Sequence, residues 1–273
     1  MYTSLFVKKV FDSLVLCGVD VEKIRKEKSS VGLGISGGAD SVSLFLALKE
    51  ILFEEKIPLV CVTVNHHIRE KNETDGDMNF VKSLCDKACD SGFDVKCEVF
   101  ELEEGAVSNT EKQRKSGVEE AARYLRYNCF EKAIESNNIS YFCLAHNQND
   151  NLETILMRFI KGSESGGIEK IRGKYIRPLL EISRTEIEAF LSEKNQTFRT
   201  DSTNLSDEYF RNKIRHKLIP VLDENFQGWK NALLTGEEKR KKTAAYVDSE
   251  IDKIPFSSKL FLNFSELAAS KVL

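Results

Sequence analysis

The sequence has no apolar run long enough to cross a membrane, which takes about 18 or more residues with few charges. Near the N-terminus, Lys8, Lys9 and Asp12 interrupt the apolar residues before a membrane span or a signal-peptide core can develop. We therefore expect an amphipathic helix there, and a cytoplasmic protein with no membrane association. The oligomeric state stays open, and a homodimer is one of the alternatives.

Paired cysteines are also missing. The seven cysteines form no Cys-x-x-Cys pair, and most of them lie in apolar stretches typical of strands or helices. Reduced core thiols in a reducing compartment explain this usage better than disulfides or zinc. Cys85 and Cys89 are four residues apart on an expected helix, so a metal pair is the alternative. No second Cys or His pair with ligand spacing accompanies them.

A strong net charge is the third absence. The formal net charge of −3 argues against a protein that coats nucleic acid with its whole surface. Two stretches are nevertheless basic: residues 158–184 have seven Lys/Arg against three Asp/Glu, and residues 208–242 have nine against five. A solvated surface explains either stretch alone, whereas two in the second half of the chain favour a polyanionic partner.

Short apolar segments alternate with amphipathic helical stretches along the chain. This pattern predicts an α/β fold with a doubly wound, mostly parallel sheet covered by helices on both faces. The length of 273 residues, 41% of them hydrophobic, suits a main domain over residues 1–217 and a short helical C-terminal extension over residues 218–273. We expect a polar, mobile segment at residues 103–116 and a further strand at residues 259–264. The main expected strands are residues 31–35, 59–64, 95–100 and 141–145.

Polar clusters directly follow three of these strands, at residues 36–41, 65–70 and 146–150. The carboxyl ends of parallel strands meet at one edge of a sheet, where ligands bind in open α/β folds. The sequence therefore predicts one site built from segments that are distant in the chain.

The first cluster is a glycine-rich turn. Gly32, Gly34 and Gly37 formally match the GxGxxG pattern of dinucleotide-binding folds. The second strand, however, ends in Val64 and Asn65 and lacks the acidic residue that would hold a ribose. The kinase-type pattern GxxxxGKS/T is absent. We therefore do not expect a dinucleotide site.

Asp40 decides how this turn is interpreted. The backbone N–H groups and hydroxyls of Ser36, Gly37, Gly38 and Ser41 lie at an expected helix N-terminus, a place that favours anions. A carboxylate beside a phosphate becomes reasonable when Mg²⁺ lies between them, because Mg²⁺ binds one or two carboxylates together with phosphate oxygens. The turn therefore indicates a metal-bound nucleotide tail. The alternative is a tight turn in which Asp40 only caps the helix.

Residues 36–41, Ser-Gly-Gly-Ala-Asp-Ser, match the SGGxDS loop of the N-type ATP pyrophosphatases of the PP-loop superfamily. These enzymes cleave ATP between its α- and β-phosphates to adenylate a substrate. Later segments resemble, in order, the tRNA(Ile)-lysidine synthetases, so that the resemblance runs from about residue 29 to residue 222. These segments are GVEEAARYLRYNCF (117–130), HNQNDNLETILMRFIKGS (146–163), IRPLLEISRTEI (176–187) and TDSTNLSDEYFRNKIRHKLIP (200–220).

The resemblance implies a reaction with ATP, Mg²⁺, free L-lysine and tRNA(Ile) with a CAU anticodon. C2 of the anticodon cytidine is adenylated, and the ε-amine of lysine then displaces AMP to give lysidine. A lysine amine with a pKa near 10.4 must be deprotonated first, at a cost of roughly 4 to 5 kcal/mol at pH 7, so a carboxylate is needed nearby.

On this resemblance we expect Asp40, Arg126, His146 and Asp150 to be catalytic, and Asp40 to bind the metal. We expect ATP to bind at Ser36, Gly37, Gly38, Ala39, Asp40 and Ser41, lysine at Asp150 and Glu153, and tRNA at Arg211, Asn212 and Arg215. Simpler roles remain open. Arg126 could form a surface ion pair, His146 could be structural, Asp150 and Glu153 could cap a helix, and the basic residues could compensate a helix dipole.

The chain departs from the family pattern at two places. The second strand is followed by Asn65, His66 and His67, where the family usually has Asp-His-Gly, and a His-His pair of the family is His146-Asn147 here. The segment after residue 220 is short compared with many relatives, and a partial tRNA-binding domain is one interpretation of it. Competing functions are a tRNA base thiolase, disfavoured by the missing Cys-x-x-Cys pairs, and a non-catalytic nucleotide or tRNA binder.

Overall fold

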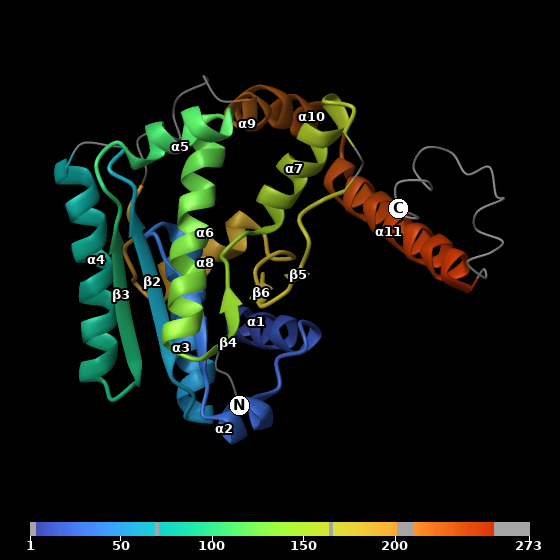
Figure 1. Cartoon of the computed structure of the whole chain (residues 1–273). Coiled ribbons are helices and arrows are strands. Elements are labelled where there is room, and N and C mark those ends of the chain that lie inside the picture. Colours follow the sequence, from blue (N-terminus) through green and yellow to red (C-terminus); the bar gives the residue numbers. More distant parts are fainter. Residues whose placement is uncertain (1–3, 69–70, 164–165, 201–209, 254–273) are drawn as a thin grey trace. The chain divides into compact units, whose positions relative to one another are not determined.

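The computed structural model describes residues 4–68, 71–163, 166–200 and 210–253 (Figure 1). The chain divides into two compact units. Unit 1 comprises residues 1–151 and 168–206, and unit 2 comprises residues 152–167 and 207–273. The predicted domain boundary after residue 217 stays a prediction. The two units are described in turn.

Unit 1 is built on a six-stranded sheet with the strand order β3-β2-β1-β4-β6-β5. The pairs β1–β2, β2–β3, β1–β4 and β4–β6 are parallel, and β5 is antiparallel to β6. The predicted α/β class with a mostly parallel sheet is therefore confirmed, as are the four main strands. The bounds are β1 Ser30–Gly34, β2 Leu59–Asn65, β3 Val95–Glu101, β4 Ile139–Cys143, β5 Ile171–Arg172 and β6 Tyr175–Ile176.

Four helices, together with Ile24 of the short helix that precedes β1, contribute to the core on one face of this sheet (Figure 1). Alternate residues of the central strand, Val31 and Leu33, point into this core together with Leu59 and Cys61 of β2. Phe6 of helix α1 stacks on Phe190 of helix α8, with ring centroids 4.2 Å apart. The helices are α1 Leu5–Leu16, α3 Ala39–Glu55, α4 Lys71–Asp90 and α8 Arg184–Glu193, and the short α2 Val21–Glu27 precedes β1.

Helix α6, Val118–Ser136, covers the opposite face (Figure 1). Its Phe130 packs against Phe142 of β4 with ring centroids 4.6 Å apart. A Cβ atom at Gly32 would lie 2.5 Å from Cδ2 of Phe142, and one at Gly34 would lie 3.0 Å from Cζ of Phe130. These two glycines of the GxGxxG match are therefore needed for close packing of aromatic rings, and a dinucleotide is not required to explain them.

The polar segment at residues 103–116 contains a helix that we did not expect, α5 Ala106–Arg114, and its mobility stays a prediction. Gly105 takes a left-handed φ of 81° at its start, and Val107 is its buried residue. A helix that buries so little apolar surface has no 3.6-residue hydrophobic period, which is why the sequence pattern does not reveal it.

Unit 2 is helical. The boundary between the units falls within α7, Gln148–Ile160, and the later helices are α9 Phe210–Lys213, a π-helical segment η2 Ile214–Leu218, α10 Ile219–Asn225 and α11 Trp229–Lys253. Within this unit Glu237 is buried and accepts a hydrogen bond from the backbone N–H of Gly167 at 3.1 Å. The strand expected at residues 259–264 lies outside the described residues. None of the described helices combines the length and apolar character needed to span a bilayer.

Candidate functional site

The three polar clusters lie at the carboxyl ends of β1, β2 and β4, which are neighbouring parallel strands. From β1 the sheet grows on one side through β2 and β3, and from β4 onward it grows on the other side of β1. The direction of winding therefore reverses between β1 and β4. Ligands of open α/β sheets bind at such a point. The arrangement predicted from the sequence is therefore present in unit 1.

The glycine-rich loop turns sharply from β1 into α3. Gly37 takes a left-handed φ of 83°, which a residue with a side chain rarely adopts. The Ser41 hydroxyl accepts a hydrogen bond from the backbone N–H of Ser36 at 3.2 Å and donates one to the carbonyl of Gly38 at 3.0 Å. Gly38 caps α3 without any side-chain hydrogen bond, so the first-turn N–H groups are available to an anion.

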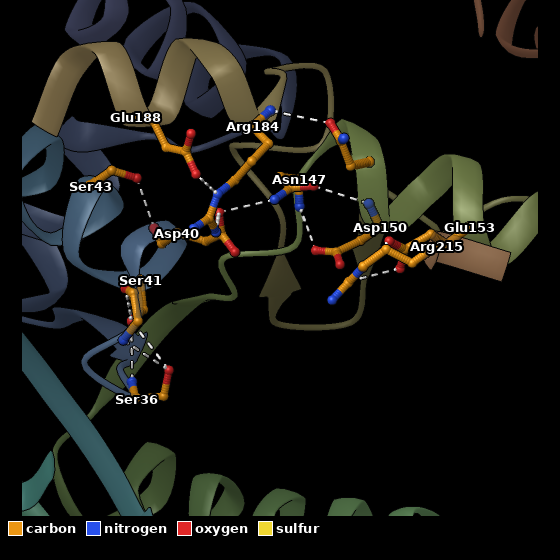
Figure 2. A network of polar contacts seen from close by, with 12 residues as sticks. Ser36, Asp40, Ser41, Ser43, Asn147, Asp150, Glu153, Arg184, Glu188 and Arg215 are labelled. Carbon is orange, nitrogen blue, oxygen red and sulfur yellow. Dashed lines mark hydrogen bonds and ion pairs between the residues drawn. The ribbon is translucent and has the colours of Figure 1, made fainter. Parts of the chain in front are cut away.

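Asp40 does not cap α3. Its Oδ1 accepts hydrogen bonds from Nδ2 of Asn147 at 3.0 Å and from a terminal guanidinium nitrogen of Arg184 at 2.9 Å (Figure 2). Burial raises the pKa of the Asp40 carboxyl, and the negative charge of Asp150 adds to this, while Arg184 and Asn147 oppose it. The positive charge and hydrogen bonds around this carboxylate do not fully offset the cost of its burial, so a further cation would be attracted to it.

Asn147 also holds Asp150. The backbone N–H of Asn147 donates to Oδ2 of Asp150 at 3.0 Å, and the backbone N–H of Asp150 donates to Oδ1 of Asn147 at 3.0 Å. This is a reciprocal capping box at the start of α7. Asp150 therefore does take part in a helix cap, which was the alternative to a catalytic role, and its side chain is held near Asp40 by the same asparagine (Figure 2).

His66 directly follows β2, and Arg126 of α6 is close enough for the charge of its guanidinium to act on the imidazole. Burial lowers the pKa of Arg126, and Arg123 lowers it further. Burial also lowers the pKa of His66 to about 4, with a contribution from the charge of Arg126. Among the residues that the structure describes, Arg126 has no ion pair with a carboxylate, although a surface ion pair was the alternative for it. A desolvated cation without a counterion favours binding of an anion.

Glu153 belongs to unit 2 and is 2% exposed at its side chain. Nε of Arg211 lies 2.6 Å from Oε2 of Glu153, and Arg215 binds both oxygens, with Nε 2.6 Å from Oε1. Asn212 is buried in the same turn. The predicted lysine contact of Glu153 and tRNA contacts of Arg211, Asn212 and Arg215 stay predictions. The ion pairs indicate that the buried carboxylate of Glu153 fixes two partly exposed arginines.

A metal site made by the protein alone is absent from the described part of the chain, because no three His, Cys, Asp or Glu side chains are grouped there. All seven cysteines are unpaired and five of them are buried, which agrees with reduced core thiols. Mg²⁺ does not need such a group, since it commonly binds one or two carboxylates and takes its other ligands from phosphates and water. The carboxylate of Asp40 fits that requirement.

Sequence reasoning missed two members of the site. Arg184 was counted only as part of a basic stretch, and Asn147 was noted only as a departure from a family pattern. Ser183 caps α8 through a capping box with Glu186, which makes Arg184 the first residue of the helix. That Ser-x-x-Glu signal predicts the helix start, but nothing in it predicts contact with Asp40, which is 144 positions away.

Comparisons with known proteins agree with this architecture. A family model described as a PP-loop domain matches residues 10–222. The tRNA(Ile)-lysidine synthase of Treponema denticola is 47% identical over 204 residues, covering 74% of this chain and 43% of that protein. The corresponding enzyme of Borrelia garinii is 37% identical and covers 93% of this chain and 59% of that protein. The chain thus spans about half the length of these relatives.

Among solved structures, the U34-tRNA thiolase NcsA from Methanococcus maripaludis is similar with a TM-score of 0.63 and 19% identity, over 86% of this chain and 78% of that chain. At this identity the likeness concerns the fold alone. The family model covers most of the chain and includes the glycine-rich loop, the α6 arginines and the Asn147–Asp150 turn. The chain therefore belongs to the PP-loop domain family.

Proposed function

We propose that this chain performs the lysidine synthetase reaction: ATP-dependent adenylation of C2 of the anticodon cytidine in tRNA(Ile), followed by attack of the ε-amine of lysine. The relatives named tRNA(Ile)-lysidine synthase support the substrate and the chemistry. The observation that carries the proposal is the link Asp40–Asn147–Asp150, which joins an anion-binding loop to a second carboxylate.

In the first step the cytidine O2 attacks the α-phosphorus of ATP, and pyrophosphate leaves with the electron pair of the broken bond. The loop N–H groups and the N-terminus of α3 bind the phosphates. Arg126 stabilises the negative charge that develops on the transferred phosphate. Asp40 would hold Mg²⁺, which would supply positive charge to neutralise the phosphates. Arg184 donates a hydrogen bond to the carboxylate of Asp40 and keeps the Asp40 side chain in place.

In the second step the lysine amine forms a bond to C2, and AMP leaves with the oxygen. Asp150 is the candidate group to attract the ammonium and to accept its proton. Its orientation by Asn147 supports this role, because a base must be held at a defined position. The roles of His146, in the loop that follows β4, and of Glu153 stay predictions. Cytoplasmic tRNA is the partner that the proposal implies, and a homodimer is not required for it.

Label transfer tests the proposal. The full chain is incubated with ATP, Mg²⁺, radiolabelled lysine and unfractionated tRNA, and label in tRNA is measured together with AMP release. We expect both to appear in equal amounts. AMP release without lysine in the tRNA would show that the enzyme adenylates another substrate, such as that of a base thiolase. Absence of both would support a non-catalytic binder.

Variants assign the roles of the two carboxylates. We expect Asp40→Asn to abolish AMP formation, and Asp150→Asn to retain ATP binding and lose lysine transfer. Asp90→Asn is a matched control, because Asp90 is exposed at the end of α4, where that helix meets the amino end of β3. Lysidine formation by Asp40→Asn or Asp150→Asn at the rate of the control would remove the role assigned to that residue.

A further inference from the structure

The glycine-rich loop contains no positive side chain. Residues 36–41 are Ser, Gly, Gly, Ala, Asp and Ser, so the lysine that often accompanies phosphate-binding loops is missing. The leaving pyrophosphate carries several negative charges, and Asp40 adds another to the same place. Backbone N–H groups neutralise only part of this charge. A cation from elsewhere in the fold is therefore needed beside the loop.

Arg199 lies directly against this loop. Its backbone N–H donates to the carbonyl of Gly37 at 2.9 Å, which ties residue 199 to the tip of the turn. A Cβ atom at Gly37 would lie 3.4 Å from Cγ of Arg199, so the side chain passes over that glycine. The contact joins parts of unit 1 that are 162 positions apart in the chain.

Among the described residues, the guanidinium is held through one nitrogen. Nε of Arg199 donates to Oδ1 of Asp77 in α4 at 2.8 Å. A Cβ atom at Gly76 would lie 3.1 Å from a terminal nitrogen, so glycine at this position gives the guanidinium room. Within the described residues the two terminal nitrogens make no hydrogen bond or ion pair. The side chain is 46% exposed and can reach a ligand.

We propose that Arg199 is a phosphate-binding residue of the adenylation step, and that its terminal nitrogens donate to the β- and γ-phosphates of ATP and to the departing pyrophosphate. Asp77 orients the guanidinium through Nε, and the Gly37 contact sets where the side chain starts. An arginine held by one nitrogen leaves two donor groups for a bidentate contact with phosphate. The inference rests on ATP as the substrate in the proposed function.

Binding measurements without tRNA test this inference. The full chain and the variants Arg199→Ala and Arg199→Lys are titrated with ATP, pyrophosphate and AMP in the presence of Mg²⁺. For Arg199→Ala we expect about a tenfold to hundredfold loss of affinity for ATP and pyrophosphate, and less than about a twofold change for AMP. Lysine at this position should restore part of the loss. The backbone contact to Gly37 is retained in both variants.

Arg25→Ala is the matched control. Arg25 lies in α2, is 42% exposed, and pairs with Glu22 of the same helix and with Glu55 at the C-terminal end of α3. It is therefore far from the loop at the N-terminal end of α3. The Arg25→Ala variant should bind ATP, pyrophosphate and AMP with the same affinities as the unmodified chain. Equal losses for AMP and ATP in Arg199→Ala would mean that Arg199 only shapes the loop, and unchanged binding would also overturn the inference. If the unmodified chain binds neither ATP nor pyrophosphate, both the proposed function and this inference fail.

Discussion

Asn147 links the two carboxylates of the site, and replacing it with serine isolates that link. Asn and Ser are about equally good at a helix N-cap, so Asn147→Ser keeps the cap of α7. It removes the amide group that donates to Asp40 at 3.0 Å. Asp40 then has Arg184 as its remaining side-chain donor within the described residues. We expect the folded protein to become less stable and the pKa of Asp40 to rise further.

The magnitude follows from the geometry. A hydrogen bond to a charged group contributes about 1.5 to 3 kcal/mol to stability. The side chain of Asp40 is 27% exposed, so water screens part of this interaction, and we expect a loss of about 1 to 2 kcal/mol. Asn147→Ala removes the cap as well and should cost about 1 kcal/mol more.

Urea unfolding of a double-mutant set measures this energy. Asn147→Ser is compared in the unmodified chain and in an Asp40→Ala background, where its bonding partner is gone. We expect the cost of about 1 to 2 kcal/mol in the first case and a cost near zero in the second. A cost that is the same in both backgrounds would refute the reasoning, because the asparagine would then act through the helix cap and not through Asp40.

Three further predictions concern the scaffold. Ser183→Ala removes the capping box with Glu186 and should lower the free energy of unfolding by about 1 kcal/mol, as measured by thermal unfolding. Ser183→Thr keeps a hydroxyl at the cap and should retain most of that stability. His66 has a pKa lowered to about 4 by burial and by Arg126, so the unfolded chain takes up a proton first as the pH falls below 6.5. Stability should therefore fall between pH 6.5 and about 4, and His66→Gln should weaken that dependence in urea titrations. Phe142→Ala should cost about 3 to 5 kcal/mol, because the ring is fully buried, whereas Phe159→Ala, at a ring that is 80% exposed, should cost far less.

Much of unit 1 could be predicted because local patterns report burial. The strands β1 and β2 are almost continuously apolar, and a strand buried on both faces has this composition. β3 is an edge strand and alternates apolar residues with Lys96 and Glu98. The position of Asp40 also follows from the sequence. A strand and the next parallel strand are joined by a crossover, usually a helix, so the turn that contains Asp40 lies at the carboxyl end of the first strand. Helix α5 could not be predicted, because its one buried residue, Val107, makes no period.

The partners of the charged groups were decided only by the tertiary structure. The sequence by itself determined which residues carry charge and that Asp40 and Asp150 each follow a strand at the same edge of the sheet. It did not determine that Arg184 binds Asp40 or that Arg199 crosses Gly37, since these contacts join positions more than a hundred residues apart. The physical reason is that hydrophobic periodicity is a local property of the chain, whereas an ion pair depends on where two distant backbones meet after the core has packed.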